Sequence, residues 1–225
     1  MTNTNKLAAF ILLDRSGSMA GPRWENAIGA INTYVNSLKK AGTEADVTVA
    51  AFDTAHDVIV NSMNPRYAVL PLSEQPESVS FDTLRSAVPV KKYNPISIDE
   101  TTPRGGTPLY DATAKIIDLA ELNGAEKTAI IIMTDGEENQ SKKYTLSTIR
   151  DRIASCQNRN WEVLFLGAEF NAETVAHSYG ISSGKVINTS LNNISATMDW
   201  YAGSTTAYAT RGVAVDTSAV KADLA

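Results

Sequence analysis

The feature that most constrains this chain is its first apolar run, which ends abruptly in side chains that carry oxygen. Every residue from 7 to 13 is apolar. The run is too short to cross a membrane and fits a strand that is buried on both faces, as in the middle of a parallel sheet. Asp14, Ser16 and Ser18 follow at alternate positions. Because alternate residues of an extended segment point the same way, we expect one carboxylate and two hydroxyl groups to converge there.

Segments with the periodicity of strands and of helices alternate along most of the chain. The expected strands are residues 7–13, 47–52, 129–133, 163–166 and 185–187, and the expected helices are residues 24–38, 109–124, 146–156 and 173–179. Such alternation is typical of the α/β class and predicts a doubly wound, mostly parallel central sheet flanked by helices, as in Rossmann-like folds. In the opening third, the order strand, helix, strand predicts a right-handed crossover.

The pattern weakens between residues 54 and 106, where most of the prolines lie. We expect a loop-rich edge of the sheet there, with short strands at 58–60, 67–70 and 88–90 and either a short helix or another strand at 81–87. Near the end of the chain, spaced apolar side chains predict a helix over residues 191–210. The expected organisation is a domain over 1–190, that helix packed on it or extending from it, and a flexible tail over 211–225.

Composition and charge limit the classes of function. The 225 residues are 43% hydrophobic and carry a net charge of -5, and the isoelectric point is near 5.1. Lysine and arginine are too scattered to neutralise a run of phosphates, so we expect no nucleic-acid partner and no membrane partner. The one cysteine, Cys156, permits no internal disulfide and falls on the apolar face of its helix. No signal peptide is evident at the first apolar run, so a cytoplasmic location is expected.

Two more oxygen-bearing side chains are expected at the same edge of the sheet. Thr107 precedes Pro108 and is expected at the N-cap of the helix that begins there. Asp135 follows the strand expected at 129–133. Because ligands of doubly wound sheets bind at the carboxyl ends of strands, these two residues should share a crevice with the three that follow the first strand. Hydroxyl and carboxylate oxygens suit Mg²⁺, Mn²⁺ or Ca²⁺ and not zinc.

These positions resemble the metal-ion-dependent adhesion site of the von Willebrand factor A domain family. The family pattern is D-x-S-x-S, then a distant Thr, then a distant Asp followed by Gly. The residues that match it here are Asp14, Ser16, Ser18, Thr107 and Asp135. The resemblance covers roughly residues 7–180, with residues 54–80 longer and more irregular, as an insertion would be. The chain looks in particular like the short stand-alone members found in bacteria and phages.

The resemblance implies how such a site binds its ligands. Ser16, Ser18 and often Thr107 would ligate a divalent ion directly, Mg²⁺ or Mn²⁺ with Ca²⁺ as an alternative, while Asp14 and Asp135 would hold coordinated waters. Mg²⁺ keeps water wherever the protein offers no ligand, which leaves one position open to an outside carboxylate. The expected function is therefore that of a protein-binding module, not of an enzyme. Its partner would be a protein that offers a Glu or Asp side chain, and an ATPase-linked complex, as for some bacterial relatives, stays open.

Several residues next to the ligands are candidates for the rim that meets a partner. They are Arg15, Met19, Arg104, Tyr110 and Glu137. For the first four, packing at the surface is an equally good interpretation. Glu137 belongs to an acidic stretch, residues 136–139, that either tunes the attraction for a metal or caps the next helix.

Two other classes of function stay open. The first is a structural or assembly protein in which the site is incidental and the C-terminal helix carries association. The second is a metal-dependent hydrolase or phosphotransferase. An aspartyl-phosphate enzyme needs a second acid where Ser16 stands, and R-S-G-S-M is not the G-x-S-x-G pattern. His56 and His177 have no Cys or His neighbours at zinc spacing, so the sequence offers little for catalysis.

Overall fold

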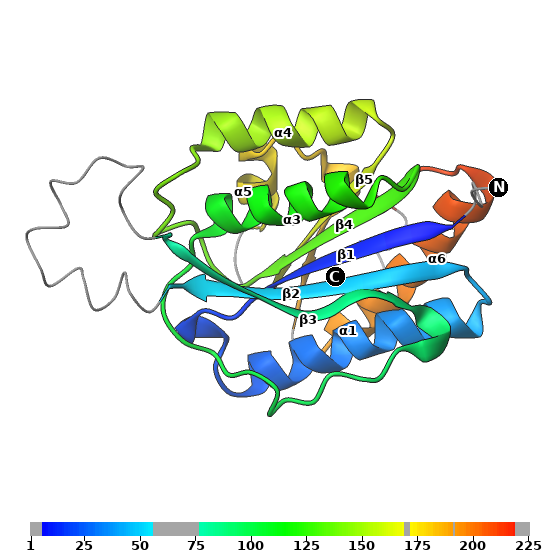
Figure 1. The fold of residues 1–225 in the computed structure, drawn as a ribbon, viewed down its shortest axis with the longest axis horizontal. Helices are drawn as coiled ribbons and strands as arrows, with labels where there is room; N and C mark the ends of the chain where they lie inside the picture. Colours follow the sequence, from blue (N-terminus) through cyan, green and yellow to red (C-terminus); the bar gives the residue numbers. More distant parts are fainter. Residues whose placement is uncertain (1–5, 56–76, 169–171, 191, 219–225) are drawn as a thin grey trace, which may run out of the picture.

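A six-stranded sheet between two layers of helices forms the centre of the computed structural model (Figure 1). The structure describes residues 6–55, 77–168, 172–190 and 192–218. The strands are β1 Leu7–Asp14, β2 Ala45–Thr54, β3 Val79–Pro89, β4 Lys127–Thr134, β5 Glu162–Ala168 and β6 Val186–Thr189. Their order in the sheet is β3-β2-β1-β4-β5-β6. β3 is antiparallel to β2, and the other neighbouring pairs are parallel, so the expected doubly wound, mostly parallel α/β fold is confirmed.

Helices cover both faces of this sheet. They are α1 Pro22–Lys40, α3 Leu109–Asn123, α4 Leu146–Asn158, α5 Ala172–Ser178 and α6 Ile194–Arg211. α1 and α6 pack on one face, while α3, α4 and α5 pack on the other (Figure 1). Pro22 begins α1, as its fixed φ favours at the first helical position.

The central strand β1 supplies both halves of the core. All its residues are buried. Leu7, Ile11 and Leu13 face the α1 and α6 layer, whereas Phe10 and Leu12 face the layer of α3, α4 and α5. Each such side chain stabilises the fold by roughly 1.5–3 kcal/mol through burial. Because both faces are apolar, the polar residues of this segment can stand only at the end of the strand, which is where Asp14 lies.

The irregular stretch before α3 contains one long strand and a return path along α1. β3 shows that residues 81–87 form a strand, the second of the two alternatives, and it continues to Pro89. The short helix η4, Val90–Lys92, follows it. Asn32 of α1 then accepts a hydrogen bond from the Ile96 amide and donates one to its carbonyl, both at 2.9 Å. This path brings the chain to the carboxyl end of the sheet. The strands expected at 58–60 and 67–70 lie outside the described residues.

The C-terminal helix is an integral part of the domain. α6 buries Met198, Tyr201 and Tyr208 in the core that it shares with α1. Hydroxyl contacts join the two helices, among them Tyr34 to Thr205 at 3.1 Å. The helix expected over 191–210 is thus present, and it packs on the sheet instead of extending from it.

The prediction of a flexible tail from residue 211 is wrong for residues 212–218, which pack against the domain. Val215 and Thr217 are buried. The Val215 amide donates to Glu162 Oε1 at 3.2 Å, and the Thr217 amide donates to the Gly184 carbonyl at 2.9 Å. These residues therefore form a strap across the start of β5 and the turn η5, Ser183–Lys185. Residues 219–225 lie outside the described part of the chain.

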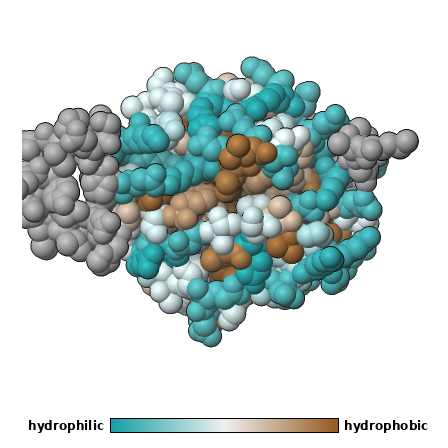
Figure 2. Space-filling model, viewed as in Figure 1, coloured by the Kyte–Doolittle hydropathy of each residue, from teal (hydrophilic) through white to brown (hydrophobic). Residues whose placement is uncertain are grey.

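The visible surface is mostly hydrophilic, with small apolar patches scattered across the face that Figure 2 shows. Across the described ranges, the large hydrophobic side chains that are exposed are Ile98, Leu122 and Val213. Within those same ranges, no helix has the length and apolar character needed to cross a bilayer.

Candidate metal centre

Asp14 ends β1 with a carboxylate that is wholly buried, at 0% exposure. One of its oxygens accepts a hydrogen bond from the Ser16 amide at 2.7 Å, and the other accepts one from Thr134 Oγ1 at 2.6 Å. Thr134 ends β4, so this carboxylate joins the loops that follow two neighbouring strands. Burial raises the pKa of Asp14 to about 6, partly opposed by the hydrogen bonds from Thr134 and Ser16.

A chain of hydroxyl groups leads from Asp14 toward the surface. Ser16 Oγ lies 3.0 Å from Ser18 Oγ, and Ser18 donates to Asp135 Oδ1 at 2.7 Å. The short helix η1, Gly17–Met19, turns the chain so that both serines face the same point. The Asp135 side chain is only 2% exposed, and its buried Oδ2 accepts no hydrogen bond but lies 3.5 Å from Arg23 Nη1. A buried carboxylate oxygen that accepts no hydrogen bond favours a positive charge beside it, which makes this position suited to a cation.

Thr107 reaches the same point from a third loop. Its Oγ1 and Ser18 Oγ lie 3.8 and 3.9 Å from the position that a Cβ on Gly136 would take. The Thr107 amide donates to Asn139 Oδ1 at 2.9 Å, and its carbonyl accepts from the Asn139 amide at 3.1 Å. The structure thus brings together all five residues that the sequence placed in the site. α3 begins at Leu109 with Pro108 at the N-cap, so the expectation that Thr107 caps this helix is wrong by one residue.

The loop before Thr107 passes so close to its neighbours that glycine is needed. A Cβ on Gly106 would lie 2.8 Å from Gln140 Cγ, 2.9 Å from Asn139 Oδ1 and 3.1 Å from Thr54 Oγ1. The Gly105 carbonyl accepts from the Gly17 amide at 3.0 Å, which bonds this loop to the serine loop directly. Backbone groups therefore hold the three loops in contact. The hydroxyl oxygens of Ser16, Ser18 and Thr107 would need only small movements to bind one ion.

The sequence profile of the von Willebrand factor type A domain matches residues 10–211. The chain belongs to the von Willebrand factor type A domain family. Because the match extends to the end of α6, the C-terminal helix belongs to the family domain, and the boundary expected at residue 190 does not separate it. A search of curated protein sequences found no match for this chain.

Solved structures with the von Willebrand A-type fold resemble this chain at low sequence identity. The pilus adhesin SpaC from Lactobacillus rhamnosus GG matches with a TM-score of 0.65 and 12% identity, over 92% of this chain and 31% of that one. The minor pilin PilB from Streptococcus sanguinis matches with a TM-score of 0.60 and 11% identity, over 92% and 62%. Proximal thread matrix protein 1 from the mussel byssus matches with a TM-score of 0.57 and 15% identity, over 88% of this chain and 45% of that one. The chain thus spans less than two thirds of each, and these matches support the fold.

Two of the residues predicted for the partner-facing rim of this von Willebrand A-type domain are buried. Arg15 is 2% exposed, and its guanidinium lies 2.7 Å from both Asp53 and Asp82. The prediction is wrong because Arg15 stands between Asp14 and Ser16 in an extended segment and so points to the opposite side, toward β2 and β3. Met19 is also buried, because the turn of η1 directs it into the core beneath α1.

The other three rim candidates differ in exposure. Arg104 is 57% exposed and donates through Nε to Asp53 at 2.6 Å. Tyr110 is half-buried and packs edge-on against Tyr179, with ring centroids 5.7 Å apart. Glu137 is exposed. Of the rim predicted from the sequence, Arg104 and Glu137 therefore lie open to solvent.

Several supporting residues escaped the sequence reasoning. Asp53 is fully buried between Arg15 and Arg104. Its position as an acidic residue directly after the second apolar run could have marked it in the sequence. Glu138 accepts hydrogen bonds from the amides of Tyr110 at 2.9 Å and Ser141 at 2.6 Å. The acidic stretch after Asp135 therefore caps α3, which precedes it in the chain, rather than the next helix.

The chemistry of the donors separates this site from carboxylate-rich or zinc-type centres. Among the residues that the structure describes, no group of three or more His, Cys, Asp or Glu side chains is placed to hold a metal. His177 lies 2.8 Å from Ser183 on the far part of the domain, and Cys156 is a buried free thiol. A metal bound at the five-residue site would rest mostly on hydroxyl oxygens, as hard divalent cations accept.

Proposed function

We propose that this domain binds a divalent cation and through it captures an acidic side chain of a partner protein. The cation would be Mg²⁺ or Mn²⁺, with Ca²⁺ as an alternative. Ser16, Ser18 and Thr107 would ligate it directly, and Asp14 and Asp135 would hold its coordinated waters, so that three loops form the site. The observation that carries the proposal is the buried Oδ2 of Asp135, which accepts no hydrogen bond and lies 3.5 Å from Arg23 Nη1, next to the chain of hydroxyls from Ser16 to Ser18.

The donor set fits such a cation and leaves it reactive. Hydroxyl oxygens are neutral, and the two carboxylates already accept hydrogen bonds from Thr134, Ser16 and Ser18. A bound Mg²⁺ would supply a Lewis acid that keeps much of its positive charge, because few anions touch it. Ser18 is exposed, so the outer side of the site faces solvent. A carboxylate from a partner would supply the missing negative charge.

The similar structures support a binding role, since two of them are a pilus adhesin and a minor pilin. We extend only protein interaction to this chain, because the matches share little sequence. The cytoplasmic location and the link to an ATPase stay predictions from the sequence.

The two rival functions have less support. An assembly role for the C-terminal helix needs a free apolar face, but α6 buries its apolar side chains against α1 and the sheet. A hydrolase or phosphotransferase needs a nucleophile and a base near the cation. The hydroxyls around Asp14 are bonded to one another and to the Asp135 carboxylate, and two of the similar structures are a pilus adhesin and a minor pilin, so we infer that the domain is a binding module and not an enzyme.

Calorimetric titration of the purified domain with Mn²⁺ and with Mg²⁺ tests the cation site. We expect binding by the wild type and loss of binding in Ser16→Ala, with the same circular dichroism and the same urea midpoint in EDTA. Ser155→Ala, an exposed serine on α4, is the matched control and should bind like the wild type. If Ser16→Ala binds Mn²⁺ with unchanged affinity, the hydroxyl ligands are misassigned.

Capture of partner proteins tests the second half of the proposal. The immobilised domain should retain partner protein in Mg²⁺, release it in EDTA and fail to retain it as Ser16→Ala. Retention that survives chelation would instead favour the assembly role.

A further inference from the structure

Arg104 lies three residues before Thr107, on the loop that brings Thr107 to the candidate metal site. Its Nε donates to Asp53 Oδ2 at 2.6 Å, and its Nη2 donates to Ser80 Oγ at 3.4 Å. Its backbone amide donates to the Arg15 carbonyl at 2.8 Å. Arg104 therefore joins the Thr107 loop to the end of β2, to the start of β3 and to the loop that follows β1.

Asp53 links Arg104 to a second arginine, which is buried. The other oxygen of the same carboxylate, Oδ1, accepts from Arg15 Nη2 at 2.7 Å. Arg15 Nη1 lies 2.7 Å from Asp82 Oδ2 and also donates to the hydroxyl of Thr101, which belongs to the same loop as Arg104. The cluster contains two positive and two negative side chains. It therefore holds the loop without placing a net charge beside a cation site.

The Thr107 loop needs an attachment at Arg104 because two glycines follow it. Gly105 and Gly106 separate Arg104 from Thr107. Glycine loses more conformational freedom on folding than any other residue, so contacts are needed on both sides of the pair. After the pair, the amide and the carbonyl of Thr107 bond to Asn139. Before the pair, the side chain of Arg104 supplies the attachment to Asp53.

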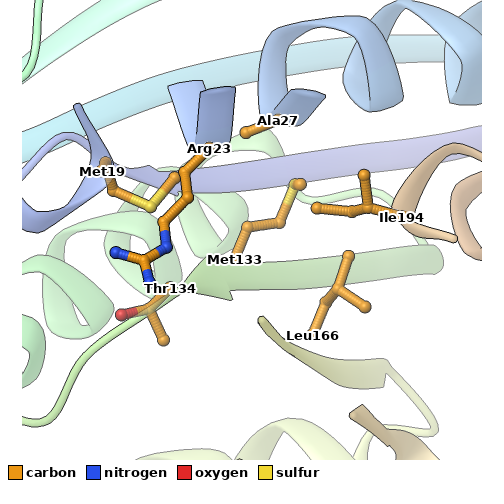
Figure 3. Close-up of a pocket in the computed structure, with 7 residues that line it drawn as sticks. All are labelled: Met19, Arg23, Ala27, Met133, Thr134, Leu166 and Ile194. Carbon is orange, nitrogen blue, oxygen red and sulfur yellow. The ribbon is translucent and has the colours of Figure 1, made fainter. Parts of the chain in front are cut away.

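The other two loops of the site are held from inside the molecule. Met19 anchors the loop that follows β1, because it points into a small hollow beneath α1 (Figure 3). The other residues that line this hollow are Arg23, Ala27, Met133, Thr134, Leu166 and Ile194. Asp135 directly follows the buried strand β4. By contrast, each residue from 101 to 106 is exposed or partly exposed, so this loop depends on polar contacts.

We propose that Arg104 is a positioning residue that acts through Asp53 to hold Thr107 at the cation site, and that this makes the site favour Mg²⁺ over Ca²⁺. The inference rests on the proposed function and names the residues that fix the geometry of that site. Mg²⁺ requires near-octahedral geometry with ligands at about 2.0–2.1 Å, whereas Ca²⁺ accepts irregular shells at about 2.3–2.6 Å. A Thr107 hydroxyl that is slightly displaced is thus a poorer ligand for Mg²⁺ than for Ca²⁺.

The sign of the effect separates this role from a direct effect of charge. Arg104 is positive, so its removal would tighten the binding of any cation if its charge were the main influence. At about 0.15 M salt, screening weakens the field of a side chain that is 57% exposed. We therefore expect that loss of the contact with Asp53 dominates and that Mg²⁺ binding weakens.

The first test measures the loop without any metal, in Arg104→Gln, Arg159→Gln and the wild type. Arg159 is the matched control, because it is also exposed and donates to a carboxylate, Glu121 Oε1 at 2.7 Å, beside the start of β5. Hydrogen exchange of the Gly17 amide, which donates to the Gly105 carbonyl at 3.0 Å, is followed by NMR in EDTA. It should be about threefold faster in Arg104→Gln only, as expected for the loss of one largely solvated ion pair. Urea unfolding in EDTA shows that each variant is folded.

The second test measures how the same proteins choose between two ions. Mg²⁺ and Ca²⁺ each compete with Mn²⁺, and electron paramagnetic resonance reports the Mn²⁺ that is released at about 0.15 M salt. Mg²⁺ should bind about threefold more weakly to Arg104→Gln than to the other two proteins, while the affinity for Ca²⁺ should change less than about 1.5-fold. A general loss of stability would weaken both ions equally, so the ratio of the two affinities reports the position of the ligand.

Each outcome supports or overturns the role of Arg104. Faster exchange of Gly17 together with a lower preference for Mg²⁺ supports it. If the wild type binds both ions but Arg104→Gln keeps or gains Mg²⁺ affinity, or loses both affinities equally, the positioning role is wrong and the cation site stands. Unchanged exchange of Gly17 overturns the inference as well, since the loop then does not depend on Arg104. If the folded wild type binds no divalent cation, the proposed function fails and this inference fails with it.

Discussion

Replacing Asp53 with asparagine removes the charge that holds two arginines beside the candidate site. The Asp53 carboxylate is 0% exposed, with Oδ1 2.7 Å from Arg15 Nη2 and Oδ2 2.6 Å from Arg104 Nε. Asparagine keeps the size of the side chain but replaces one oxygen by a donor that faces another donor. The buried guanidinium of Arg15 then loses its main counter-charge.

The expected loss of unfolding free energy is about 3 kcal/mol. Breaking a buried ion pair by removing one partner costs about 3–5 kcal/mol, since the remaining charge stays buried. We expect the lower end because Arg15 keeps Asp82 at 2.7 Å. The Arg104 contact adds less than about 1 kcal/mol, because its guanidinium is largely solvated. The total free energy of unfolding of such a domain is about 5–15 kcal/mol, so the Asp53→Asn variant should still fold.

Urea denaturation in EDTA, followed by tryptophan fluorescence, measures this loss. The matched control is Asp82→Asn, which removes the same charge from the other partner of Arg15, a side chain that is 52% exposed. That control should lose at most about 1 kcal/mol. Equal losses in the two variants, or a loss below about 1 kcal/mol for Asp53→Asn, would show that burial does not govern the strength of this pair.

Three further predictions concern the site and α1. Without metal, the raised pKa of Asp14 contributes stability that is fully present below about pH 4 and lost as pH rises through about 6. Urea unfolding in EDTA should thus show about 1 kcal/mol less stability at pH 7 than at pH 5, and this difference should disappear in Asp14→Asn; an unchanged pH dependence in that variant contradicts the assignment. Gly106→Ala should lose about 1–3 kcal/mol and weaken Mn²⁺ binding, because the new methyl group meets Gln140 and Asn139, and calorimetry would detect both effects. Gly29→Ala, whose new Cβ would meet nothing within 4 Å, should instead raise the free energy of urea unfolding by about 0.5–1 kcal/mol; a loss there would mean that α1 is more closely packed than the structure shows.

The parts of the site that the sequence predicted are those fixed by local rules. The buried strand β1, the alternation from Asp14 to Ser18 and the strand before Asp135 depend on periodicity within a few residues. The general position of Thr107 followed from the rule that strand ends share one edge of the sheet. No local pattern predicts the two hydrogen bonds that join Thr107 to Asn139.

The parts that the sequence missed depend on contacts between distant segments. Arg15 is buried because β3 returns antiparallel to β2 and brings Asp82 to it, a pairing that leaves no periodic mark in the sequence. In the sequence, Arg23 looks like any polar residue of an amphipathic helix, because its ion pair with Asp135 depends on the fold. The strap over residues 212–218 has small and mixed side chains, and its order comes from backbone hydrogen bonds to Glu162 and Gly184.

The strap also sets a limit on how far the chain can be shortened for laboratory work. A version that stops at the last residue of α6 would remove the hydrogen bond from the Val215 amide to Glu162, a buried carboxylate. It would also uncover the start of β6, where Thr217 donates a hydrogen bond to the Val186 carbonyl. Such a product should be prone to aggregation, because it opens a strand edge and an apolar surface together. Expression vectors for crystallography or binding work are better designed to retain at least residue 217.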